Sequence, residues 1–245
     1  MTVNNEIQVY IVTGSNTGVG RELVRILYSA NATVYMACRT ESKARNAMQE
    51  IREAVPASKG RLEFLHLDLG DLRTIKPAAE AFTARENKLH VLFNNAGVMT
   101  PPEDQKTAQG YDMQLGTNCV GPFLFTKLLT PTLALTAASE LPGSVRVVWV
   151  SSIATELYSV KYGMDVRKLR GKEYEGNPDS LEMYGISKAG NYFHAVEYAR
   201  RHKSEGIVSV VSFKNMPPPE QRPTDVNFLS GYEPRQPRLR ALPLR

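Results

Sequence analysis

Short apolar runs alternate along the chain with longer segments in which apolar residues recur every three or four positions. The runs are mostly non-alternating, as expected for strands that are covered on both faces of a parallel sheet. They predict strands at 7–13, 33–37, 62–67, 89–94, 145–150 and 207–212. Because helical segments separate these runs, the pattern predicts an α/β fold with a doubly wound parallel sheet.

The segments between the runs have the periodicity of amphipathic helices. In the first of them, Val19, Leu23, Ile26, Leu27 and Ala30 fall on one face. The other helices are expected at 41–55, 71–87, 107–129 and 184–202.

Two stretches break this rhythm. Residues 153–183 insert a polar, tyrosine-bearing segment between the fifth strand and the next helix. From Phe213 onward the pattern stops, and seven of the fifteen prolines fall in the last 33 residues. Proline at that density excludes further helices and central strands. We therefore expect one domain over 1–212 and an atypical Pro-rich tail over 213–245 that is extended or disordered.

The charge of the chain argues against a nucleic-acid partner. Residues 213–245 carry six Lys or Arg and three Asp or Glu, which leaves only +2 of the net charge of +5 for the rest. The domain is therefore nearly neutral. No stretch approaches the roughly 20 apolar residues of a membrane span, and polar residues at the start argue against a secretory signal. The expected location is the cytoplasm.

The cysteines give no sign of a metal site or a disulfide framework. Cys38 and Cys119 are the only two, and their spacing fits neither use. We expect both to be small buried residues and expect no metal ligands. With 42% hydrophobic residues among 245, the chain can bury a full core.

The first strand ends in a glycine-rich turn, TGSNTGVG, which then opens the first helix. Glycine lets the backbone approach a pyrophosphate, and a helix N-terminus presents free N–H groups and positive dipole to it. We expect Gly14, Ser15, Gly18, Val19 and Gly20 to bind a dinucleotide cofactor. The domain over 1–212 is then a dinucleotide-binding domain of the Rossmann type, with strand order 3-2-1-4-5-6.

The end of the second strand bears on the choice of cofactor. In dinucleotide folds an acidic residue near this point binds the adenosine ribose, whereas an arginine accommodates a 2′-phosphate. Here Arg39 follows a strand that has no acidic residue. We therefore expect NADP(H) to be preferred over NAD(H). The alternative is that Arg39 is an exposed arginine that binds no ligand.

Five motifs occur in a fixed order along the chain. They are TGSNTGVG (13–20), NNAG (94–97), Asn118 in a helix, Ser151-Ser152 after the fifth strand, and YGISK (184–188). Together they resemble the short-chain dehydrogenase/reductase family over residues 6–212. The ACR, HLDL and NNAGVM segments resemble its retinol-dehydrogenase-like members. The long insertion resembles filamentous-fungal members, many of which act in secondary metabolism.

The chemistry of the last motif follows from its residue types. Tyr184 alone among the eleven tyrosines has a lysine four positions later, and on a helix this spacing puts Tyr184 and Lys188 on one face. The ordinary pKa of tyrosine, about 10, makes it a poor base at neutral pH. We expect Lys188 and an oxidised nicotinamide to lower that pKa, so that Tyr184 exchanges a proton with an alcohol or a carbonyl. A hydroxyl at Ser152 would stabilise the charge that develops on the same oxygen.

The family resemblance implies further roles for single residues. It assigns the nicotinamide ribose to Lys188 and a water-mediated proton relay to Asn118. It also assigns adenine to Asp68 and the lining of the cofactor cleft to Asn95. Tyr184 and Lys188 thus belong both to the catalytic group and to the cofactor ligands.

The chain departs from the family after the sixth strand. The family continues there with a Pro-Gly turn, a lid over the substrate and a seventh strand, none of which residues 213–245 resemble. We expect the seventh strand to be missing.

Two functions remain open. The first is an NADP(H)-dependent oxidoreductase that interconverts a carbonyl and a secondary alcohol on a small molecule. Insertion residues such as Leu157, Tyr158, Tyr162 and Tyr174 favour an apolar one. The alternative is a cofactor-binding, catalytically impaired variant that acts through partners. Either function is compatible with a homo-oligomer.

Overall fold

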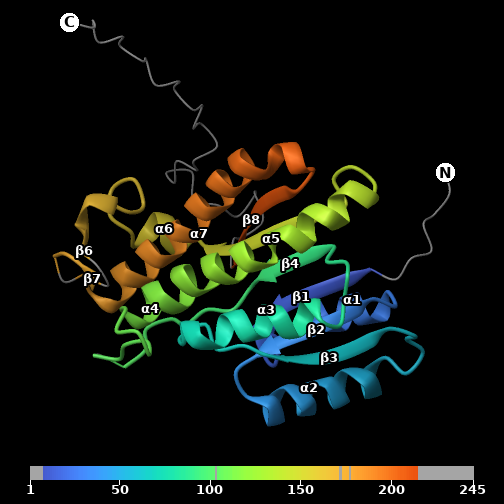
Figure 1. Ribbon diagram of the computed structural model, residues 1–245. Helices are drawn as coiled ribbons and strands as arrows, with labels where there is room; N and C mark the ends of the chain where they lie inside the picture. The colour runs from blue at the N-terminus through green and yellow to red at the C-terminus, as the bar shows by residue number, and fades with distance from the viewer. Residues whose placement is uncertain (1–7, 103, 171–172, 177, 215–245) are drawn as a thin grey trace, which may run out of the picture. The chain divides into compact units, whose positions relative to one another are not determined.

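The computed structural model describes residues 8–102, 104–170, 173–176 and 178–214. Six strands form one parallel sheet in the order β3-β2-β1-β4-β5-β8 (Figure 1). Since β8 is the sixth of these strands along the chain, the predicted order 3-2-1-4-5-6 is confirmed. The bounds are Val9–Thr13 (β1), Thr33–Cys38 (β2), Arg61–His66 (β3), Val91–Asn94 (β4), Arg146–Ser152 (β5) and Val208–Lys214 (β8).

Helices cover both faces of this sheet (Figure 1). α1 (Gly18–Ser29) and α2 (Glu41–Ala54) pack on one face, and α3 (Ile75–Thr83), α5 (Gly121–Ser139) and α7 (Ser180–His202) pack on the other. Successive residues of a strand point to opposite faces. Ile11 therefore joins the core under α3 and α5, while the next residue, Val12, joins the core under α1 and α2.

The helix predicted at 107–129 needs correction at both ends. It begins later, at α4 (Met113–Leu115), passes through a π-helical turn at Gly116–Val120, and continues as α5 to Ser139. Pro131 lies inside α5 and does not end it. Proline removes one hydrogen bond of the helix, and its ring crowds the carbonyl four residues earlier. Because Phe125, Leu129 and Leu133 are fully buried on the same helix, its packing outweighs that loss.

Two other helices also differ from their predicted bounds. The segment 71–87 contains a 3₁₀ turn at Leu72–Thr74 and then α3, which ends at Thr83. α7 begins four residues before the predicted start at 184. The reason is a cap: the Asp179 carboxylate accepts the N–H groups of Leu181 and Glu182.

The insertion at 153–183 is partly folded. It contains α6 (Ala154–Leu157), a 3₁₀ turn (Val166–Lys168) and the antiparallel pair β6 (Leu169–Arg170) and β7 (Glu173–Tyr174). A small apolar core joins it to α4 and α7. Tyr174 is buried in that core, and its hydroxyl accepts the N–H of Asp165 at 3.0 Å. Leu157, Tyr158 and Tyr162 are exposed.

One apolar segment corrects the expectation about membrane spans. Met113–Ser139 is long and apolar enough to cross a bilayer, so a stretch of the required length does exist. Nearly half of its most apolar part is buried, and α5 packs against α3 and β4. The core helix of a soluble protein passes the same test of length and composition, so the segment is weak evidence for a span.

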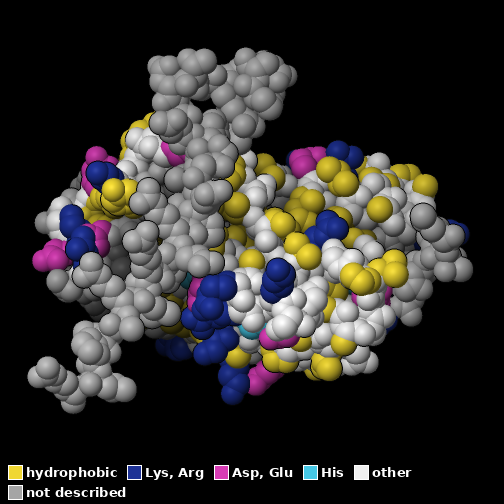
Figure 2. Space-filling view, turned by 90° about the horizontal axis from the view of Figure 1, so that it is seen from above, with side chains coloured by type: hydrophobic (Ala, Val, Ile, Leu, Met, Phe, Trp, Pro, Cys, Tyr) yellow, Lys and Arg dark blue, Asp and Glu magenta, His cyan; other side chains and the backbone are white. Residues whose placement is uncertain are grey.

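Charged side chains are dispersed on the face shown in Figure 2. Over the described part of that face, Lys and Arg form small separate groups, several with Asp or Glu beside them, and no continuous basic surface covers it. This distribution agrees with the small net charge outside residues 213–245.

Part of the predicted tail belongs to the sheet. Phe213 and Lys214 extend β8 two residues past the predicted strand end and pair with Ser151 and Ser152. The described residues belong to one compact unit, which ends at Asn215. The rest of the tail and the missing seventh strand are predictions about residues 215–245, which lie outside the described residues.

Candidate active site

The glycine-rich turn joins β1 to α1 and lines a pocket of about 330 Å³. Gly14 and Gly18 have φ angles of 62° and 56°, which glycine adopts without a steric penalty. Thr17 precedes α1, and its side chain makes no capping hydrogen bond. The first N–H groups of α1 are therefore left without a side-chain cap at the pocket. Such groups bind phosphate oxygens in dinucleotide sites.

Close packing leaves no room for a side chain at two of the glycines. A Cβ on Gly14 would lie 2.8 Å from Cα of Ala96, and one on Gly20 would lie 2.5 Å from Nδ2 of Asn95. Asn95 Nδ2 also donates to the carbonyl of Thr13 at 2.9 Å. Its Oδ1 is buried and has no hydrogen-bond partner within the described part of the chain. A narrow cradle with an unsatisfied acceptor fits a bound dinucleotide.

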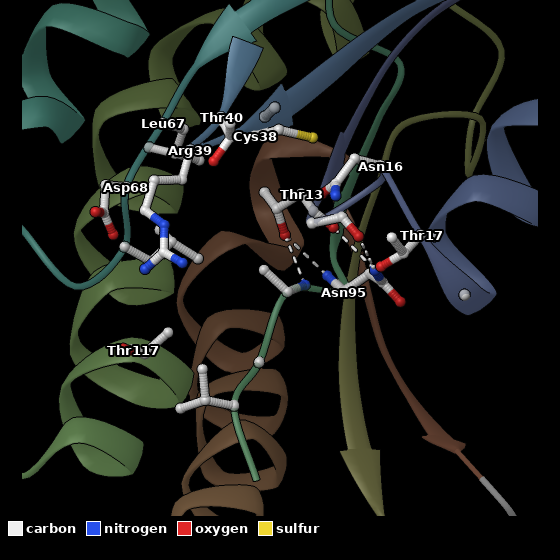
Figure 3. A pocket seen from close by; sticks show the side chains of 18 of the residues that line it. Thr13, Asn16, Thr17, Cys38, Arg39, Thr40, Leu67, Asp68, Asn95 and Thr117 are labelled. Atoms are coloured by element: carbon white, nitrogen blue, oxygen red, sulfur yellow. Dashed lines mark hydrogen bonds between the residues drawn. The ribbon is translucent and has the colours of Figure 1, made fainter. Parts of the chain in front are cut away.

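Two cations stand at the other end of this pocket. Arg39 follows β2, Lys43 lies in the first turn of α2, and both line the pocket. Neither forms an ion pair within the described ranges. Figure 3 shows the Arg39 side chain reaching into the pocket on the side of Asp68, with Thr13 and Asn95 across from it. This end of the pocket is suited to a phosphate monoester.

Tyr184 and Lys188 lie one turn apart on α7, as their spacing predicts, and both are buried. Lys188 Nζ lies 5.8 Å from the centre of the Tyr184 ring and donates to the carbonyl of Val150 at 2.9 Å. Ser152, at the end of β5, hydrogen-bonds with Tyr184. The Ser152 Oγ also accepts the N–H of Ala154 at 3.2 Å. The fold thus brings together three of the four residues predicted to be catalytic.

The fourth, Asn118, lies in the π-helical turn and is fully buried. Its Oδ1 accepts the N–H of Val98 at 2.8 Å, and its Nδ2 donates to the Val98 carbonyl and to Ser187 Oγ, both at 2.9 Å. A Cβ on Gly97 would lie 3.1 Å from both Asn118 Oδ1 and Lys188 Nζ. Since Gly97 lines the cofactor pocket, that pocket ends against the catalytic group.

The pKa of Tyr184 differs from the expected one. Burial raises it above the ordinary value of tyrosine, and the hydrogen bond with Ser152 acts in the opposite direction. Lys188 was expected to lower the pKa of Tyr184, but this effect is not seen. Burial of the phenol has the larger effect on that pKa, and the Lys188 ammonium donates to the Val150 carbonyl instead. In the chain alone Tyr184 is therefore protonated at neutral pH and suited to donate a proton.

Seven of the ten predicted cofactor ligands line the pocket, and Ser15, Tyr184 and Lys188 do not. Ser15 is fully buried, and its hydroxyl lies 3.4 Å from the Cys38 sulfur instead. Sequence reasoning missed Lys43, although its place four residues after Arg39 was a usable signal. It also missed Thr117, which faces the pocket from the π-helical turn. The predicted ligands that do line the pocket are Gly14, Gly18, Val19, Gly20, Arg39, Asp68 and Asn95.

Both cysteines are free and buried, as predicted. Burial raises the pKa of the Cys119 thiol to about 12, and Cys119 Sγ donates to the Ser187 carbonyl at 2.8 Å. A protonated, enclosed thiol is a poor nucleophile. Within the described ranges, no three His, Cys, Asp or Glu side chains gather as metal ligands would.

Known proteins match both the sequence and this fold. The family model described as short chain dehydrogenase matches residues 8–164. A short-chain dehydrogenase/reductase of Phomopsis amygdali is 52% identical over 205 residues, which cover 83% of this chain and 60% of the relative. One of Emericella nidulans is 49% identical over 205 residues, covering 83% and 64%. The chain thus spans less than two thirds of the length of these relatives.

The solved structures that resemble this chain include one with a nicotinamide cofactor. A metagenomic short-chain oxidoreductase in complex with NADP superimposes with a TM-score of 0.62 at 25% sequence identity. The match covers 84% of this chain and 80% of that one.

Proposed function

The chain belongs to the short-chain dehydrogenase family of oxidoreductases, and from that premise we propose that it uses NADP(H) to interconvert a carbonyl and a secondary alcohol. The observation that carries the proposal is the meeting of Tyr184, Lys188 and Ser152 where the cofactor pocket ends at Gly97. Because the chain is shorter than its relatives, turnover by this chain itself is part of the proposal.

The residues divide the proton chemistry between them, while the bound nicotinamide supplies or accepts the hydride. Tyr184 is protonated and donates its proton to the carbonyl oxygen during reduction. Ser152 accepts the N–H of Ala154, so its own proton is available to the same oxygen. Lys188 does not lower the pKa of Tyr184 in the chain alone, so its proposed role is the one that the family resemblance implies, to bind the nicotinamide ribose beside the phenol.

The preference for NADP(H) rests on the adenosine end of the pocket. A 2′-phosphate would find Arg39 and Lys43 there, and both are free of ion pairs within the described ranges. The N-terminus of α2 adds its positive dipole at the same place. A metagenomic relative of the same fold binds NADP, which supports the proposal.

The substrate is proposed to be small and apolar. Leu157, Tyr158 and Tyr162 of the insertion expose apolar surface close in sequence to Ser152. Their place between Ser152 and α7 favours an apolar molecule beside the catalytic group.

The test is an activity screen over small aliphatic and aromatic ketones with NADPH, run on the parent chain and on Tyr184→Phe. This substitution keeps the ring and removes only the proton donor, so we expect at least about a 100-fold loss of kcat. The Kd for NADPH should change less than about twofold. Tyr10→Phe, at the start of β1 and outside both the pocket and the insertion, is the matched control and should leave both values unchanged.

Two outcomes decide against the proposal. Full activity of Tyr184→Phe would remove Tyr184 from the mechanism. Tight NADPH binding by the parent without turnover of any ketone would support the alternative, a cofactor-binding protein that acts through partners.

A further inference from the structure

A second pocket lies between α5 and α7 over β5, with a volume of about 490 Å³. None of its lining residues lines the cofactor pocket. Trp149 of β5 lines the pocket on the side of the sheet, and it is the single tryptophan of the chain. The proposed redox chemistry makes no use of this pocket.

Aromatic rings form one wall of the second pocket. The imidazole of His194 stacks on Phe123 with ring centres 5.5 Å apart, and Trp149 lies 5.2 Å from it on another side. Tyr198 meets the Trp149 ring at 6.2 Å, edge to face. Burial lowers the pKa of His194 to about 4, so this ring is neutral at pH 7. The wall is suited to stacking against a planar aromatic group.

A hydroxyl pair lies beside this wall. Thr130 donates its only hydroxyl proton to the Thr126 carbonyl at 2.8 Å, so Tyr198 is the donor in the 3.0 Å contact between Tyr198 and Thr130. Burial raises the pKa of Tyr198 to about 12 and keeps the phenol neutral. The interior of the pocket therefore carries no charge that would repel an anion.

The mouth of the pocket carries excess positive charge. Lys127 lies there, exposed, and has no ion-pair partner in the part of the chain that the structure describes. Glu197 binds Arg200 at 2.8 Å and Arg201 at 2.6 Å, so one carboxylate serves two guanidinium groups. With Glu205, which hydrogen-bonds to the lining residue His202, these side chains leave about one positive charge over a neutral aromatic interior.

From this combination we propose that the pocket between α5 and α7 binds a small aromatic anion, such as an aromatic carboxylate, separately from the cofactor. The ring lies against Phe123, Trp149 and His194, and the acid group lies at the mouth near Lys127 and Arg201. A pocket of this volume accepts a molecule of about two fused rings.

The test uses anilinonaphthalene sulfonate, an aromatic anion whose absorption overlaps tryptophan emission. Because Trp149 is the only tryptophan, binding in this pocket quenches its emission and raises that of the dye. We expect saturable quenching of the parent chain, unchanged by excess NADPH or NADH. Naphthoate should displace the dye, and its neutral analogue naphthalene methanol should do so at least about tenfold more weakly.

Matched variants separate this pocket from general binding of the dye. Lys127→Glu reverses the charge at the mouth and should weaken binding at least about fivefold. Phe123→Ala removes part of the wall and should weaken it about as much. Lys76→Glu makes the same charge change on α3, away from this pocket, and should leave the affinity within about twofold.

Other outcomes overturn the proposal. Release of the dye by NADPH or NADH would place it in the cofactor pocket. If Lys127→Glu and Lys76→Glu weaken dye binding equally, the dye binds the protein surface non-specifically rather than in this pocket. If sedimentation shows a dimer that the dye dissociates, the pocket is covered by a second copy of the chain.

Discussion

At the scale of single residues, two cations carry the proposed preference for NADP(H). Arg39 and Lys43 line the same end of the pocket without ion-pair partners within the described ranges. Hydrogen bonds in which one partner is charged are roughly twice as strong as neutral ones. We therefore expect the parent chain to bind NADPH at least about tenfold more tightly than NADH, as measured by fluorescence titration. Equal dissociation constants would contradict the proposed preference.

Single substitutions should show how much each of the two cations contributes to the affinity for NADPH. Arg39→Asp places a carboxylate against the 2′-phosphate and should weaken NADPH about 100-fold, while NADH binding stays or improves. Lys43→Ala should weaken NADPH about fivefold and leave NADH unchanged. Arg45→Ala removes the same charge from the same helix, but Arg45 pairs with Glu41 and does not line the pocket. This control should change neither affinity.

From spacing alone, the sequence could identify only residues whose partners are close along the chain, and Asn118 and Ser152 were identified through the family resemblance. Tyr184 and Lys188 share a helix face because four positions make about one turn, and the structure places them together. Ser15 shows the limit of a turn motif, since its hydroxyl faces Cys38 rather than the pocket. The contact of Asn118 with Ser187 joins residues 69 positions apart. No spacing rule predicts such a contact.

At the scale of elements, Gln114 connects two segments of the site. Its side chain is buried, its Oε1 accepts the N–H of Thr100 at 3.1 Å, and its Nε2 donates to the Ser180 carbonyl at 2.8 Å. It thereby joins the loop after β4 to the start of α7, the helix that carries Tyr184.

Replacing this side chain by one of similar size should loosen the connection. Gln114→Leu removes both hydrogen bonds of this buried side chain, so we expect a loss of roughly 1–3 kcal/mol in the free energy of unfolding. Chemical denaturation measures this loss. Gln49→Leu, at an exposed position on α2, is the control and should cost less than about 0.5 kcal/mol. Equal stability of the two variants would mean that Gln114 does not hold these segments together.

Strands were easier to predict than helix ends, for a physical reason. A buried parallel strand is a run of apolar residues, and every predicted run contains most of an observed strand. Helix ends depend on caps and on tertiary packing. The apolar face of α5 holds it together past Pro131, and the Asp179 cap starts α7 before its first core residue. The helix propensities of single residues do not account for either effect.

At the scale of the whole molecule, buried and paired groups make stability depend on pH. The pKa of His194 is about 4 in the folded chain, below its ordinary 6.5, so the unfolded chain takes up a proton first as the pH falls. Stability is therefore full above about pH 6.5 and declines toward pH 4. We expect His194 to account for a decline on the order of 2–3 kcal/mol. Unfolding of the parent and of His194→Phe, followed between pH 7 and pH 4, measures it. A parallel decline in both proteins would contradict the assignment.

Carboxylates should add a second decline at lower pH. Ion pairs with arginine hold the pKa of Asp165 and of Glu197 at about 2, below the ordinary values. Their contribution is present above the ordinary pKa of a carboxyl group and is lost as the pH falls toward 2. Both pairs are at the surface, so salt should reduce this second decline, whereas the buried His194 should respond little.

The π-helical turn at Gly116–Val120 limits which changes of chain length the protein tolerates. A π-helical turn holds one more residue than an α-helical turn, so deleting a single residue there would give a regular helix from Met113 to Ser139. Regular hydrogen bonding would favour that shorter helix. The helical segments on either side would keep their orientation, because a π turn and an α turn complete about the same rotation, but the residues within the turn would shift and separate Asn118 from Val98 and Ser187. A deletion at this point could therefore yield a folded helix and an inactive site. The extra residue makes the hydrogen bonding of this helix less regular, but it also holds Asn118 in the position from which it contacts Val98 and Ser187.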